Sequence, residues 1–283
     1  MRQPDIISGL SAVADRYDAV LCDVWGVIHN GRESFPEAIE ALQTFGRTRG
    51  PVVLISNAPR PSQAVLSQLS GLKVPADAWS AFVTSGDATR AELRRRAPGP
   101  VWALGPERDA PLYEGLDLEF AGPEEARFIC CTGLVDDDAE RPEDYLERLA
   151  GPAGRGLEMI CANPDRVVQK GDHLIYCAGA LADVYEGLGG PVIMAGKPFA
   201  PVYRLALDEA ERAAGRPAPR VLAIGDGIPT DVKGANAQEL DCLFVARGIH
   251  AGELRNPLEP AEVGTLLARD GAFAAYAVDG LRW

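Results

Sequence analysis

The sequence is poor in positive charge. Its 283 residues include 28 lysines and arginines against 41 aspartates and glutamates, which gives a net charge of −13 and a pI near 4.8. The average field of such a surface repels nucleic acid and anionic lipid, so we expect neither as a partner. A local group of backbone N–H donors, a lysine and a metal can override this sign within a cleft. Small anions therefore stay among the expected ligands.

Several other signals are missing from the sequence. It contains no run of about 18 apolar residues, so we expect no membrane span. The first ten residues lack the basic and apolar segments of a secretory signal. The six cysteines show no paired C-x-x-C spacing for zinc, and most lie in apolar runs, which favours buried reduced thiols. We expect a cytoplasmic protein without internal repeats or low-complexity tracts.

What is present is the composition of an ordinary folded protein, with 47% apolar and 24% charged residues. At this length two domains are a better expectation than one. Short apolar runs alternate with segments of helical period, such as residues 37–48 and 61–70. Continuous apolar strands separated by helices predict a doubly wound α/β fold, with a parallel sheet covered on both faces. The expected strands are Ala19–Cys22, Val52–Ser56, Ala81–Thr84, Val101–Leu104, Phe128–Thr132, Leu157–Cys161, Val192–Ala195, Val221–Ile224 and Leu240–Val245.

Four of these strands are followed or ended by polar residues of a catalytic type. Asp23 follows the first strand, and Ser56 and Asn57 lie at the end of the second. Lys197 follows the strand at 192–195, and Asp226 follows the strand at 221–224. Ligands of parallel sheets bind beyond the carboxyl ends of the strands. If these strands share one sheet, the four groups therefore converge on one crevice.

The stretch between the second and third of these groups is long enough for a separate domain. Residues 87–190 contain expected strands of their own and end in the glycine-rich segment Gly187-Leu188-Gly189-Gly190, which could act as a hinge. We therefore predict a Rossmann-like core made of residues 1–86 and 191–283, interrupted by an inserted α/β domain at 87–190.

The carboxylates in this set point to a metal. Asp226 and Asp231 are five residues apart around a turn that contains glycine and proline. Mg²⁺ binds proteins through one or two carboxylates together with phosphate oxygens of a substrate, so the pair predicts a magnesium site. A solvated turn is the alternative for this segment. Asp23 alone fits a nucleophile, a metal ligand or a turn cap equally well.

The remaining polar residues are suited to binding an anion. Lys197 lies between a glycine and a proline directly after a strand, which holds its backbone while the ammonium reaches into the crevice. Ser56 can donate a hydroxyl and Asn57 an amide from one turn, although Ser-Asn after a strand is by itself a weak helix-cap signal.

In this order, and each at a strand end, these four motifs resemble those of the haloacid dehalogenase-like phosphohydrolases. The chain is similar to the subfamily with a large α/β cap between the second and third motifs, which includes NagD-like sugar phosphatases, nitrophenylphosphatase-like proteins and pyridoxal phosphatases. The resemblance covers nearly the whole chain and thins at both ends. Its further matching segments are 83–89, 161–165, 179–181 and 196–198.

The resemblance implies a Mg²⁺-dependent phosphatase that acts on a small organic phosphate, such as a sugar or aryl phosphate. Asp23 would attack phosphorus and form an aspartyl-phosphate, which splits one difficult step into two. Phosphoryl contacts would come from Gly26, Ser56, Asn57 and Lys197, and substrate contacts from Asn163 and Asp165 in the cap. The metal ligands would be Asp23, the backbone carbonyl of Trp25 and Asp226, with Asp231 acting through water or orienting the others.

The family pattern breaks at Trp25. The family has a second aspartate at this position, which protonates the leaving oxygen and later activates water. The indole N–H cannot transfer a proton at neutral pH, so the general acid is missing. Its loss matters most for alkoxide leaving groups and little for aryl or acyl phosphates. His29 in the same turn titrates near neutrality and is a candidate substitute, and a locally bonded histidine is the alternative.

Trp25 also keeps a second function open, that of a phosphometabolite-binding or regulatory protein that retains the fold, the metal and the phosphate site but has little turnover. A third possibility is a different reaction on the same scaffold, such as phosphoryl transfer to an acceptor other than water. The sequence does not identify the substrate, and it allows a homodimer without predicting one.

Overall fold

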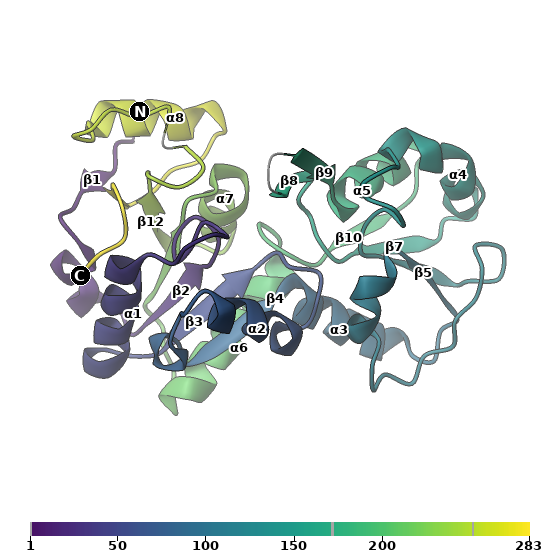
Figure 1. The fold of residues 1–283 in the computed structure, drawn as a ribbon, viewed down its shortest axis with the longest axis horizontal. Helices are drawn as coiled ribbons and strands as arrows, with labels where there is room; N and C mark the ends of the chain where they lie inside the picture. The colour runs from purple at the N-terminus through teal and green to yellow at the C-terminus, as the bar shows by residue number, and fades with distance from the viewer. Residues whose placement is uncertain (1, 171–172, 251) are drawn as a thin grey trace. The chain divides into compact units, whose positions relative to one another are not determined.

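The computed structural model describes residues 2–170, 173–250 and 252–283. The chain divides into two compact units, one made of residues 1–56, 66–83 and 197–283 and the other of residues 57–65 and 84–196. In each unit a sheet is flanked by helices (Figure 1). The inserted-domain limits of 87 and 190 stay a prediction.

The first unit is organised around a seven-stranded sheet with the order β1-β13-β12-β11-β2-β3-β4. Neighbouring strands run parallel from β1 through β3. The strands are β1 (Asp5–Ile6), β2 (Ala19–Asp23), β3 (Val52–Ser56), β4 (Ala81–Thr84), β11 (Val221–Gly225), β12 (Asp241–Val245) and β13 (Tyr276–Val278). Strands β2 and β11 are buried at every residue, as expected for central strands covered on both faces.

Helices cover both faces of this sheet. They are α1 (Pro36–Thr48), α2 (Ser62–Gly71), α6 (Ala200–Ala214), α7 (Lys233–Ala237) and α8 (Pro260–Arg269). Side chains alternate along β11: Leu222 and Ile224 join an apolar cluster that includes α1, and Ala223 joins one that includes α7 and α8. This alternation buries both faces of the strand and leaves its carboxyl end to carry polar residues.

The second unit has a four-stranded sheet with the order β10-β7-β6-β5 and a separate antiparallel pair, β8 with β9. Its strands are β5 (Val101–Leu104), β6 (Phe128–Cys131), β7 (Glu158–Cys161), β8 (Val167–Lys170), β9 (His173–Tyr176) and β10 (Val192–Met194), and its helices are α3 (Ser85–Arg96), α4 (Leu146–Gly154) and α5 (Ala178–Gly187). A capping box at Thr84 and Asp87 begins α3.

The predicted α/β class with a parallel sheet is confirmed, and each expected strand is present to within one residue at either end. One condition of the prediction is wrong: the strand before Lys197 belongs to the sheet of the second unit and not to the sheet that carries Asp23. Strands β1, β8, β9 and β13, each of two to four residues, were not predicted. All six cysteines are buried and unpaired. In the described part of the chain, no helix has the length and apolar character needed to span a bilayer.

Candidate active site

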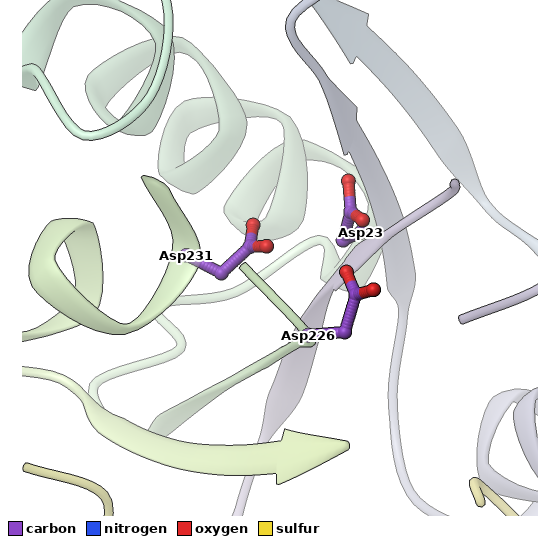
Figure 2. A group of neighbouring side chains, drawn as sticks. All are labelled: Asp23, Asp226 and Asp231. Carbon is purple, nitrogen blue, oxygen red and sulfur yellow. The ribbon is translucent and has the colours of Figure 1, made fainter. Parts of the chain in front are cut away.

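The backbone of the first unit brings two aspartates together at the end of its sheet. Strands β2 and β11 are parallel neighbours, and Cys22 is paired with Ile224. Asp23 ends β2, and Asp226 follows the last residue of β11, so both carboxylates leave the same edge of the sheet. A single π-helical turn at Ile228–Val232 then carries Asp231 back toward them (Figure 2).

The three carboxylates form one buried cluster. One oxygen from each of Asp23, Asp226 and Asp231 lies within 4.8 Å of the others. Their exposed fractions are 7%, 6% and 4%, so little water reaches them. Three carboxylates this close in a desolvated site repel one another strongly unless a cation joins them.

One such cation is present. The Lys197 ammonium donates hydrogen bonds to Asp23 Oδ1 at 2.5 Å and to Asp231 Oδ1 at 2.7 Å, and it lies 3.4 Å from the Ile55 carbonyl oxygen. Lys197 is 3% exposed. It therefore joins two of the acids, but one ammonium cannot balance three carboxylates.

The pKa values reflect this imbalance. Burial raises the pKa of Asp23 well above its ordinary value, and repulsion from Asp231 and Asp226 adds to the effect despite the Lys197 charge. Burial, followed by repulsion from Asp231, raises the pKa of Asp226 to about 6. Burial alone would lower the pKa of Lys197, but the Asp23 and Asp231 carboxylates hold it well above its ordinary value. The cluster is thus short of positive charge.

Backbone groups complete the surroundings of Asp226; Gly26 was among the predicted site residues, whereas Gly248 and Ile249 were not. The Ile249 N–H donates a hydrogen bond of 2.7 Å to Asp226 Oδ2. A Cβ atom at Gly248 would lie 1.9 Å from this oxygen, and one at Gly26 would lie 2.1 Å from it. Gly26 also has a φ of +83°, which favours glycine. A side chain at position 26 or 248 would therefore collide with the Asp226 carboxylate. The sequence signal for Gly248 is a glycine shortly after a strand.

The donor set fits a divalent cation. All three side chains offer carboxylate oxygens, the ligands that Mg²⁺ prefers. Asp231 Oδ2 accepts the Gly227 N–H at 3.0 Å, which orients that carboxylate. Lys197 donates to Asp23 Oδ1 and the Ile249 N–H donates to Asp226 Oδ2. A carboxylate has about four lone-pair sites, so both side chains can bind a further ligand.

The other predicted site residues are distributed over both units. Ser56 ends β3 one residue beyond Ile55, the register partner of Asp23, which puts it at the same sheet edge. In the second unit Asn57 donates a hydrogen bond of 3.0 Å to Asp165 Oδ1, and Asn163 Oδ1 accepts the Asp165 N–H at 3.0 Å. These three residues form one bonded group. A contact of Asn163 and Asp165 with substrate stays a prediction.

The turn after β2 holds Trp25 and His29. The Trp25 side chain is 51% exposed, and its indole packs edge-on against the His29 ring with centroids 5.2 Å apart. His29 is buried, and its Nδ1 accepts the Gly31 N–H at 3.1 Å. Because Nδ1 accepts this bond, the proton of the neutral ring lies on Nε2. The Nδ1 lone pair is then not available to accept a second proton. Burial also lowers the pKa of His29. These contacts favour a structural role for His29 in the turn.

Two family models match the chain. A model described as haloacid dehalogenase-like hydrolase matches residues 20–119, and one described as HAD-hydrolase-like matches residues 194–269. The matched segments contain Asp23 and Ser56 in one case and Lys197, Asp226 and Asp231 in the other. Both groups of site residues are therefore part of what the models describe.

Solved structures and relatives agree with these matches. A haloacid dehalogenase-like hydrolase from Brucella suis is 42% identical with a TM-score of 0.84, and the match covers 98% of this chain and 100% of that one. The 5′-nucleotidase YutF of Bacillus subtilis is 25% identical over 82% of this chain and 88% of its own length. A glycerol phosphate phosphatase from Mycobacterium tuberculosis in complex with magnesium is 24% identical over 84% and 70% of the two chains, with a TM-score of 0.66.

Proposed function

The chain belongs to the haloacid dehalogenase-like hydrolase family, and on that premise we propose that it is a Mg²⁺-dependent phosphatase whose phosphoryl acceptor is Asp23. The family and its named relatives make it a hydrolase of phosphoric monoesters. The observation that carries the proposal is the cluster in which Asp23, Asp226 and Asp231 offer oxygens within 4.8 Å of one another around Lys197.

The chain would hold the metal through Asp23, the backbone carbonyl of Trp25 and Asp226, with Asp231 orienting this group or binding through water. When bound, Mg²⁺ supplies positive charge that offsets the charge on the transferring phosphoryl group. A need for this positive charge is consistent with the cluster itself, in which one buried ammonium faces three carboxylates. A magnesium complex of a structural relative also supports this choice of metal.

The first step would be attack of Asp23 Oδ2 on phosphorus. The bond from phosphorus to the leaving oxygen breaks, the electron pair stays on that oxygen, and an aspartyl-phosphate forms. Lys197 would hold a phosphoryl oxygen with its ammonium, and Ser56 would donate its hydroxyl. Gly26 and Asn57 would contribute further donors. Water then attacks phosphorus, which releases phosphate and restores the Asp23 carboxylate.

The leaving group would have to depart without a proton from position 25. Trp25 offers no acidic proton, and His29 has its Nδ1 lone pair engaged by the Gly31 N–H. A general acid typically contributes about 10²–10⁴-fold to a rate. We therefore propose fast turnover of aryl and acyl phosphates and slow turnover of alkyl phosphates. The half-exposed Trp25 indole could stack on the ring of an aryl leaving group.

The acidity of the chain supports a small-molecule substrate, with neither nucleic acid nor membrane as partner. A cytoplasmic location stays a prediction. A homodimer stays a prediction.

The test is a panel of phosphate esters assayed with Mg²⁺ for released phosphate. We expect turnover of 4-nitrophenyl phosphate, and a loss of about 10⁴-fold or more in Asp23→Asn, because the nucleophile is gone. Asp208→Asn, an exposed aspartate on α6, is the matched control and should behave as the unmodified protein. Unchanged turnover in Asp23→Asn would remove Asp23 as the nucleophile.

The runner-up is a phosphometabolite-binding protein with little turnover, and Trp25 is the observation that favours it. It predicts binding of phosphate esters with Mg²⁺ but no phosphate release from any member of the panel. A steep fall in rate from aryl to alkyl phosphates would instead support an enzyme without its general acid.

A further inference from the structure

Four segments of the chain that resemble the family pattern converge on one place in the second unit. They are residues 83–89, 161–165, 179–181 and 196–198. The structure gathers one residue from each segment around Asn57 and Asp165. The chain passes from one unit to the other between residues 56 and 57 and again between 196 and 197. This group therefore adjoins two proposed phosphoryl ligands, Ser56 and Lys197, each through a single peptide bond.

Asp165 accepts the hydrogen bond that orients the Asn57 amide. Asn57 is 8% exposed, and its Nδ2 donates to Asp165 Oδ1 at 3.0 Å. The backbone of Asp165 is held on both sides, because its N–H donates to Asn163 Oδ1 at 3.0 Å and its carbonyl oxygen accepts the Gly179 N–H at 3.1 Å. Gly179 lies in the first turn of α5. The Asn57 side chain is thus tied to the start of a helix.

The backbone of Gly196 packs against the oxygen of the same amide. A Cβ atom at Gly196 would lie 2.5 Å from Asn57 Oδ1 and 2.7 Å from Ser85 Oγ. Ser85 is fully buried and begins α3. Because the contact leaves no room for a side chain, a shift of the Asn57 amide toward Gly196 must displace Gly196 as well. The positions of Asn57 and Gly196 are therefore fixed together.

The alternative for Asp165, a direct contact with a phosphoryl group, suits a carboxylate poorly. An ionised carboxylate accepts hydrogen bonds and donates none, so it repels phosphoryl oxygens. As the partner of Asn57 it is well suited, because a hydrogen bond to a charged acceptor is shorter and stronger than a neutral one. The amide is then held in one orientation, with Nδ2 toward Asp165 and Oδ1 toward Gly196.

We propose that Asp165 is a positioning residue of the phosphoryl site. Through Asn57 it holds the backbone that follows Ser56 against the backbone that precedes Lys197, and both of these phosphoryl ligands belong to the first unit. The inference rests on the proposed phosphatase function and gives Asp165 a role in place of the predicted contact with substrate. Because Asp165 acts on the groups that hold the phosphoryl oxygens, its loss weakens binding of phosphate esters and of inorganic phosphate by the same factor.

The first test exchanges the two side chains. Asn57→Asp sets two carboxylates against each other and should weaken binding of inorganic phosphate in the presence of Mg²⁺ by about 10- to 100-fold. The double variant Asn57→Asp/Asp165→Asn restores a bond between an amide and a carboxylate and should recover most of this loss. Calorimetric titration measures the affinities, and Asp117→Asn, which alters an exposed aspartate of the same unit, is the control. No recovery in the double variant overturns the inference.

The second test keeps Asn57, so its result does not depend on whether Asn57→Asp folds. Asp165→Asn retains an oxygen that can accept the Asn57 amide, whereas Asp165→Leu has a similar size and no acceptor. We expect the dissociation constant of inorganic phosphate and KM for 4-nitrophenyl phosphate to rise about threefold in Asp165→Asn and about 10- to 100-fold in Asp165→Leu. Equal losses in the two variants would assign the effect to the charge of Asp165 and overturn the inference.

The outcomes also separate this inference from the proposed function. Hydrolysis of 4-nitrophenyl phosphate with a phosphate affinity that does not follow the Asn57–Asp165 bond overturns the role of Asp165 and leaves the phosphatase intact. A loss for esters that inorganic phosphate does not share overturns it too, because it would place Asp165 on the leaving group. Phosphate binding that follows the bond, without hydrolysis of any ester, supports the role of Asp165 and removes the proposed function.

Discussion

The acidic cluster of the first unit and the cavity of the second unit, which is lined by Arg60, Arg108, Asp109 and Asp137, differ in how far their charges are balanced. In the cluster, three buried carboxylates face the single ammonium of Lys197. In the cavity, two arginines, Arg60 and Arg108, accompany two carboxylates, Asp109 and Asp137, and Arg108 is paired with Asp137. The first site therefore lacks positive charge, whereas the formal charges of the second are equal. Local imbalance indicates the class of ligand here, whereas the net charge of −13 would suggest cations everywhere.

The largest expected effect comes from removing the only buried cation of the cluster. Lys197→Met leaves Asp23 and Asp231 as desolvated carboxylates without a cation beside them, which should cost about 3–5 kcal/mol of unfolding free energy and nearly all activity. Chemical denaturation and the 4-nitrophenyl phosphate assay would measure the two losses.

A surface lysine provides the matched control for that variant. Lys233 lies 3.6 Å from Asp270, with side-chain exposures of 41% and 47%. Lys233→Met should cost only about 0–1 kcal/mol, because exposed ion pairs contribute little. Equal losses in the two variants would mean that the buried carboxylates do not depend on Lys197.

Metal removal tests the missing charge in the same cluster. Chelation should abolish turnover, and Mg²⁺ at about 100 times its dissociation constant should restore it and add about 2.7 kcal/mol of stability. Asp226→Asn should lose this gain in thermal denaturation. Arg60→Met should keep the gain in stability, because Arg60 lines the cavity of the second unit and is not part of the carboxylate cluster. A metal effect lost in Arg60→Met but kept in Asp226→Asn would reverse our assignment.

The third prediction concerns the proton that Trp25 cannot supply. Trp25→Asp should raise kcat/KM for an alkyl phosphate by about 10- to 100-fold and change aryl phosphate turnover little, because only a poor leaving group needs a general acid. Trp25→Phe is the control, since it removes the indole N–H without adding a carboxyl group. A similar gain in both variants would indicate relief of crowding by the indole.

Particular strands show how much of the fold could be predicted from the sequence. The runs that became β2 and β11 are apolar throughout, so they predict central parallel strands. Ligands bind beyond the carboxyl ends of such strands, so the aspartates that follow the two runs are predicted as site residues. Strands β1 and β13 comprise only two and three residues and were not predicted, although β13 is apolar throughout. The strand before Lys197 has the same apolar signature as the others, and a signature of this kind does not say which sheet a strand joins.

The sequence by itself determined the α/β class and the residue types of the site, because apolar periodicity and polar strand ends are local properties of a chain. Only the tertiary structure decided that Lys197 bridges Asp23 and Asp231, that the His29 Nδ1 accepts the Gly31 N–H, and that Asn57 binds Asp165. These are differences between charges and hydrogen-bond partners at distances of a few ångströms. They depend on which side chains folding brings together, and no spacing along the chain contains that information.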